Sequence, residues 1–140
     1  MPYAFFDHTG DIGVDVRAAS LEQLFAEAAS ALTEILTEPA LVRSRVSAEI
    51  GLSSPAIDLL LVDWLNELIY LFETRAMLVR SARVTLGRDG EEHRLDAIVE
   101  GEPLDPLCHP IKVTVKAATY HALEVLETAG GWRARIVVDV

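Results

Sequence analysis

The first half of the chain alternates between two hydrophobic periods. Apolar and polar residues alternate over 12–17 and again over 45–52, which predicts strands with one buried face. A shorter aromatic stretch, 3–6, predicts a strand before them. Apolar residues recur at three- and four-residue spacing over 21–36 and from 55 to about 74, which predicts two amphipathic helices.

Cap residues predict where the two helices begin. Ser20 with Gln23 has the pattern of a capping box in front of the first helix. Ser53 and Ser54 before Pro55 predict a cap and a first-turn proline for the second. The apolar surface of the second helix extends beyond a single stripe, so we expect it to be covered on more than one side.

The second half of the chain predicts strands joined by tight turns. Residues 78–88 and 91–100 flank Asp89-Gly90, a dipeptide typical of a type I′ hairpin. Gly130-Gly131 predicts a second hairpin. Three further segments predict strands: 112–116, 121–128 and 132–138. This order of elements predicts an α+β fold with two helices packed on a largely antiparallel sheet, in one domain over residues 1–140.

Composition limits the classes of function. The chain has 140 residues, of which 51% are hydrophobic, so it can bury a core and is too apolar for disorder. Twelve basic and 22 acidic residues give a formal net charge of −10, so we expect no direct strong nucleic-acid binding. The single cysteine, Cys108, cannot form an internal disulfide, which fits a cytoplasmic setting. We expect no leader and no membrane span, since the most apolar stretch, 57–72, carries three acidic residues.

Two acidic clusters are candidates for metal binding. Asp7, His8 and Asp11 lie within five residues, and oxygen-rich groups of this kind favour hard cations such as Ca²⁺ or Mg²⁺. An ordinary turn whose Asp side chains bond to nearby amides is the alternative. The last two residues, Asp139-Val140, offer two anionic groups, or else a solvated, frayed end.

Two other polar segments could contact a ligand or partner. Lys116 and His121 lie in a segment between two predicted strands, where a lysine could bind phosphate and a histidine could act as acid, base or ligand. The alternative interpretation of this segment is an ordinary polar turn. Asn66 and Glu67 on the second helix could face solvent, a partner or a polar site. No nucleotide-binding glycine loop, nucleophile elbow or zinc-binding helix motif occurs in the sequence. The residues alone therefore predict no reaction.

Taken together, these segments resemble the archease family over essentially the whole chain. The resemblance rests on five segments in order: Asp7-His8-Thr9-Gly10-Asp11, Leu24-Phe25, residues 64–72, Lys116-Ala117-Ala118-Thr119-Tyr120-His121 and Asp139-Val140. It implies the α+β archease fold and a protein cofactor rather than an enzyme. The partner would be an RtcB-type RNA ligase, which acts in tRNA splicing and RNA repair. Archeases promote guanylylation and multiple turnover of that ligase, so GTP and Mn²⁺ belong to the partner.

The resemblance also implies the site residues. Asp11 and Asp139 match the family's metal-binding positions, and Val140 would add a main-chain or terminal oxygen. The two ends of the chain are therefore expected to meet around a divalent cation, Ca²⁺ or Mg²⁺, with Mn²⁺ as a further option. Lys116 matches the family's functional lysine. His8 and His121 lie in the same motifs and are expected to contact the partner or a phosphate. No catalytic residue is expected.

Three residues depart from the family pattern. Gly10 replaces the usual alanine, which should only loosen the turn, and Val140 replaces isoleucine. Thr114 stands where an acidic residue often precedes the lysine motif, so the affinity for a cation is expected to be lower if that acid serves the site.

Two other functions are alternatives. One is a general chaperone or adaptor that modulates nucleic-acid enzymes, which would not depend on Asp11 and Asp139. The other is a stand-alone metal-dependent hydrolase built on His8, His121 and the nearby carboxylates, including Asp7. Turnover of a phosphoester by the protein alone would favour the hydrolase.

Overall fold

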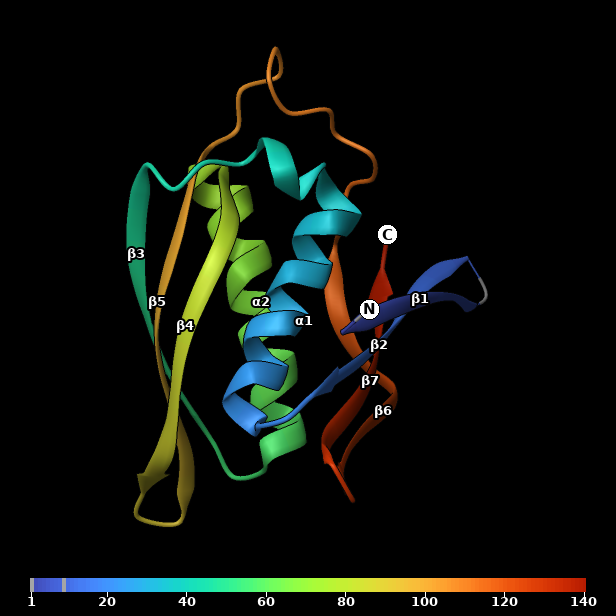
Figure 1. The fold of residues 1–140 in the computed structure, drawn as a ribbon, viewed down its shortest axis with the longest axis vertical. Helices are drawn as coiled ribbons and strands as arrows, with labels where there is room; N and C mark the ends of the chain where they lie inside the picture. The colour runs from blue at the N-terminus through green and yellow to red at the C-terminus, as the bar shows by residue number, and fades with distance from the viewer. Residues whose placement is uncertain (1, 9) are drawn as a thin grey trace.

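The computed structural model describes residues 2–8 and 10–140, and its helices lie between two antiparallel sheets (Figure 1). One sheet has four strands in the order β1 (Tyr3–His8), β2 (Asp11–Ala18), β7 (Gly131–Asp139) and β6 (Ala117–Thr128). The other has three strands in the order β3 (Val46–Ser54), β5 (Glu92–Pro103) and β4 (Met77–Asp89). The predicted α+β class is confirmed, although the strands form two sheets rather than one.

Two long helices fill the space between the sheets. They are α1 (Leu21–Leu36) and α2 (Ile57–Arg75), and a short 3₁₀ helix, η1 (Pro39–Leu41), follows α1. The Nε1–H of Trp64 on α2, which is fully buried, donates to the main-chain oxygen of Phe25 on α1 at 2.9 Å. Burying a tryptophan contributes both apolar area and a satisfied donor, so this contact locks the two helices together.

The predicted extent of α1 is correct, whereas α2 begins at Ile57, so the prediction of Pro55 in its first turn was wrong. The main-chain N–H of Gln23 donates to Ser20 Oγ at 3.1 Å, which confirms the predicted cap of α1. In α2 the cap residue is Ala56, with no side-chain cap bond. Ser54 is unavailable because it ends β3, paired with His93 and buried. Buried residues on α2 contact both sheets, as expected from its broad apolar surface.

Both predicted hairpins form, each with its turn one residue from the predicted place. Asp89 pairs with Glu92, so Gly90-Glu91 is the two-residue loop. Gly90 has φ 64° and Glu91 has negative φ, which fits a type II′ rather than a type I′ turn. Thr128 pairs with Gly131 across the second loop.

The segment around Lys116 differs from the prediction. Residues 112–116 form no strand, and β6 begins at Ala117 and continues to Thr128. Its pairing with β7 is irregular between Thr119 and Glu124, where Ala122 has φ 55°. The motif predicted to join two strands therefore lies at the start of one long, bulged strand. No helix in the part of the chain that the structure describes is long and apolar enough to cross a membrane.

Candidate functional site

One end of the four-stranded sheet gathers most of the residues predicted to form the site. His8 pairs with Asp11 across the β1–β2 turn, and Ala117 pairs with Asp139 on the other side of β7. Ile12 pairs with Val138, so extending the β2–β7 register by one residue brings Asp11 opposite Asp139. The N-terminal and C-terminal segments therefore meet, as the resemblance implied. We call His8, Asp11, Lys116, His121 and Asp139 the acidic tip.

The two carboxylates of the acidic tip have no cationic partner in the part of the chain that the structure describes. Within the described residues, neither Asp11 nor Asp139 takes part in an ion pair, although both side chains are only half-exposed. Like charges on facing strand positions destabilise a sheet, and a bound cation would remove that repulsion.

The donor set suits a hard cation that keeps some of its water. No group of three or more His, Cys, Asp and Glu side chains is placed to hold a metal ion in residues 2–8 and 10–140. Two carboxylates can still bind Ca²⁺ or Mg²⁺ when main-chain oxygens and waters complete the shell. Asp11, Asp139 and a main-chain oxygen of Val140 would hold such an ion.

Strand alternation separates Asp7 from the acidic tip. Cross-strand partners share a face of the sheet, so His8 and Asp11 lie on one face, whereas Asp7 and its partner Ile12 lie on the other. Asp7 instead borders a surface hollow with Phe5. Asp7 therefore lies on the opposite face from His8 and Asp11, so the cluster that the hydrolase alternative requires is not brought together on one face. Thr9, in the same motif, lies outside the described residues.

A glycine makes the turn at the acidic tip. Gly10 has φ 87°, in the left-handed region where residues with a Cβ are strained. The departure from the family's usual alanine therefore suits this turn rather than loosening it.

Lys116 is held directly by β7, and α2 holds the start of β6 two residues further on. Its main-chain N–H donates to the main-chain oxygen of Asp139 at 2.8 Å, while its side chain is exposed. Asn66 on α2 pairs with the backbone of Ala118 in both directions, accepting at 2.8 Å and donating at 3.2 Å. Asn66 therefore makes the two main-chain hydrogen bonds that a neighbouring strand would make to Ala118. Its position on an apolar helix did not predict this role.

The two histidines of the acidic tip touch each other. The rings of His8 and His121 meet edge to face with centroids 4.7 Å apart. His8 Nδ1 is buried and has no hydrogen-bond partner within the described part of the chain. A buried nitrogen without a hydrogen bond lowers the stability of the folded chain, so this ring pair is held by packing rather than by hydrogen bonds at that atom.

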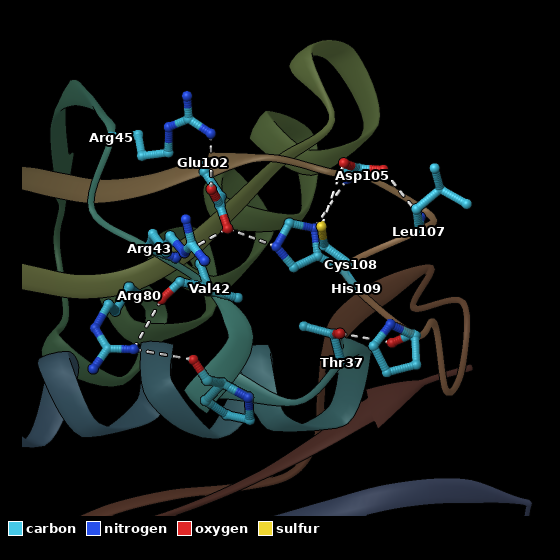
Figure 2. Close-up of polar contacts among 12 residues, drawn as sticks. Thr37, Val42, Arg43, Arg45, Arg80, Glu102, Asp105, Leu107, Cys108 and His109 are labelled. Atoms are coloured by element: carbon cyan, nitrogen blue, oxygen red, sulfur yellow. Dashed lines mark hydrogen bonds and ion pairs between the residues drawn. The ribbon is translucent and has the colours of Figure 1, made fainter.

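The segment that leads to Lys116 is held by a buried pair that no sequence motif predicted (Figure 2). Residues 104–116 join β5 to β6, and His109 in this segment donates from Nε2 to Glu102 Oε1 at 2.7 Å. We call Glu102 and His109 the latch. The main-chain N–H of Asp105 donates to His109 Nδ1 at 2.9 Å. A main-chain N–H can only donate, so Nδ1 is unprotonated and the proton is on Nε2.

The latch carboxylate is ionised. Burial by itself would raise the pKa of Glu102, but hydrogen bonds from the Arg43 main chain and from His109, with the charge of Arg45, lower it below the usual value. The hydroxyl of Thr37 also donates to the Pro110 oxygen at 2.6 Å, and Lys112 N–H donates to the Leu36 oxygen at 3.0 Å. The segment before Lys116 is therefore tied to β5 and to the end of α1. Glu102 is a single acidic residue at the end of a strand and His109 a single histidine among prolines, so no sequence motif indicates this pair.

A surface pocket lies beside the latch. It has a volume of about 670 Å³ and is lined by residues of 40–46 and 102–109, which include Arg43, Arg45 and Leu104. No residue of the acidic tip lines it. Thr114, whose predicted effect on metal affinity stays a prediction, is exposed in the segment before Lys116.

The fold and the acidic tip define a small α+β protein with two carboxylates close together at one end of a sheet. The "Archease protein family (MTH1598/TM1083)" matches residues 3–140. A "Protein archease" from Methanosarcina mazei is 37% identical over 139 residues, covering 99% of this chain and 95% of the relative. One from Methanopyrus kandleri is 35% identical over the full length of both chains. The solution structure of Methanobacterium thermoautotrophicum protein 1598 superposes with a TM-score of 0.88 at 30% identity, covering 99% of each chain.

The chain therefore belongs to the archease family. The matched relatives carry the family name and no name of a reaction.

Proposed function

We propose that this protein activates an RtcB-type RNA ligase in tRNA splicing and RNA repair, in the cytoplasm. The observation that carries the proposal is the placement of Asp11 and Asp139 at neighbouring strand ends, without cationic partners among the described residues. Membership of the archease family supports the choice of partner, because the resemblance to archeases implies a cofactor of an RNA ligase. The net charge of −10 is consistent with RNA being held by the ligase rather than by this chain.

The residues of the acidic tip have separate roles in this proposal. Asp11 and Asp139 bind a divalent cation, which when bound neutralises phosphate charge during nucleotidyl transfer. The exposed side chain of Lys116 contacts a phosphate or a carboxylate of the ligase as a point charge. His8 and His121 form a ring pair that contacts the ligase surface. GTP and Mn²⁺ are bound by the ligase, and this chain performs no chemical step of its own.

The test is a guanylylation assay of a cognate ligase with GTP and Mn²⁺, with RNA in excess over ligase. The wild-type protein should speed guanylylation and allow repeated turnover. Asp139→Ala should reduce both by about 10–100-fold, the usual effect of disturbing a metal site. Glu91→Ala is the matched control, because it removes the same charge from the exposed β4–β5 turn at the far end of the molecule (Figure 1).

Full activation by Asp139→Ala would contradict the proposal. If Asp11→Ala also retained full activity, the adaptor function would be favoured. Hydrolysis of a phosphoester by the protein without ligase would instead favour the hydrolase.

A further inference from the structure

β3 is an open edge of the three-stranded sheet. Among the strands in residues 2–8 and 10–140 it pairs only with β5, and no other segment lies beyond it in Figure 1. Its nine residues pair in unbroken register, from Val46 with Gly101 to Ser54 with His93. Such an edge exposes a row of main-chain donors and acceptors and is a template for another strand.

The other edge strands are protected in ways that β3 is not. β4 has a register shift between Val79 and Ser81, and β6 has one between Thr119 and Glu124. β1 has only six residues. β3 has no proline and no register shift, and its one charged residue is Glu49. Bulges, short length and multiple charges are the usual means of blocking edge pairing, so β3 is the edge best suited to pair.

We propose that β3 pairs antiparallel with β3 of a second copy of this chain. The sequence of β3 is self-complementary when the two strands overlap over their full length. In that register Ile50 lies opposite Ile50 and Ala48 lies opposite Leu52, so apolar residues meet at the central inward positions, while Val46 lies opposite Ser54 at each end. On the outward face Ser47 lies opposite Ser53, and Glu49 lies opposite Gly51. No two like charges face each other.

Arg94 is placed to contact Glu49, the one charged residue of β3, of the second copy. Arg94 of β5 extends across β3 above Gly51, where a Cβ would lie 2.5 Å from Arg94 Nη2. Arg94 donates to Asp96 from Nε at 3.3 Å and from Nη2 at 2.8 Å. Its Nη1 has no hydrogen bond to any residue that the structure describes. In the paired sheet, Glu49 of the second copy approaches this guanidinium, which then bridges two carboxylates.

The inward side chains at the edge also favour pairing. Ala48 and Leu52 are only partly buried in the single chain and pack at the margin of the core. A second strand would cover them and produce one continuous six-stranded sheet. An interface that consists mainly of one strand pair is small, so the dimer is expected to be weak and to form at high protein concentration.

Cross-linking tests the register directly. In a Cys108→Ser background, which removes the only native cysteine, Ser47→Cys and Ser53→Cys variants are prepared separately. Oxidation of the mixed variants at high concentration should give a disulfide-linked dimer. Oxidation of either variant alone should give little, because equal positions are about 20 Å apart in this register. Equal yields in mixed and unmixed samples, or none in either, would overturn the proposal.

Charge reversal tests the contact with Arg94. Glu49→Arg places a second cation beside that guanidinium and should raise the dimer dissociation constant about tenfold or more, measured by sedimentation. Glu73→Arg, on the exposed surface of α2, makes the same charge change away from β3 and should leave the dissociation constant unaltered. Wild-type protein that stays monomeric at millimolar concentration would also overturn the proposal. Ligase activation by the wild-type monomer would leave the proposed function standing.

Discussion

The acidic tip and the latch both consist of carboxylates and histidines, but among the described residues the carboxylate is bonded to a histidine only in the latch. In the latch, Glu102 Oε1 accepts from His109 and from the Arg43 main chain, and both ring nitrogens of His109 are bonded. At the acidic tip, Asp11 and Asp139 have no cationic partner in the described residues.

This difference separates polar groups that stabilise the fold from those available to a ligand. Buried polar groups that complete their hydrogen bonds hold a segment in one conformation. Carboxylates placed side by side without a counter-charge lower stability unless something outside the chain neutralises them. The latch therefore holds the segment before Lys116, and the acidic tip is where an external cation or partner would bind.

Removing the latch should have the largest effect on stability. His109→Ala deletes a fully buried ring with hydrogen bonds at both nitrogens, and we expect a loss of about 2–4 kcal/mol in the free energy of unfolding. Urea denaturation measures it. Cys108→Ser, at the exposed neighbouring position, is the control and should change stability little. Equal stability of the two variants would show that the latch does not hold this segment.

The latch should also make stability depend on pH in the acid range. The pKa of Glu102 is lower in the folded chain than its usual value of 4.5, so its contribution is complete above that value and is lost as the pH falls through the lowered pKa. Glu102→Gln should therefore flatten the decrease in stability below about pH 4.5. Denaturation curves of both proteins between pH 3 and pH 7, about the range in which carboxylates titrate, measure this. Parallel pH profiles would contradict the assignment.

Changing the acidic tip should affect stability least. Asp11→Asn should alter the free energy of unfolding by no more than about 0.5 kcal/mol, since the carboxylate has no cationic partner among the described residues. Millimolar Ca²⁺ or Mg²⁺ should raise the melting temperature of the wild type but not of Asp11→Asn, because a ligand that binds only the folded state stabilises it. A cation effect of equal size in both proteins would place the binding site elsewhere.

Local pattern was sufficient for most elements of the fold. The extents of α1, α2 and the β4–β5 hairpin follow from periodicity and turn residues, which depend on neighbours a few positions away. The missed details involve distant residues. Ser54 cannot cap α2 because it pairs with His93, and the expected strand over 112–116 is absent because those residues cross from one sheet to the other.

Local sequence patterns predicted only part of the candidate site. Asp11, Lys116 and Asp139 could be named from motifs, but no local pattern links residues near opposite ends of the chain. Their contact arises from the pairing of β7 between β2 and β6. Asn66 was named without its role, and the latch was missed, because each acts on a residue or segment that only the folded chain brings near.

The sequence by itself determined the α+β class, the helices, the strand faces and the acidic character, because burial and charge are properties of local composition and period. The tertiary structure alone decided the division into two sheets, the meeting of Asp11 with Asp139 and the open edge at β3. Strand order and register are long-range choices, set by which hydrophobic faces can be buried together, and no short stretch of sequence contains that information.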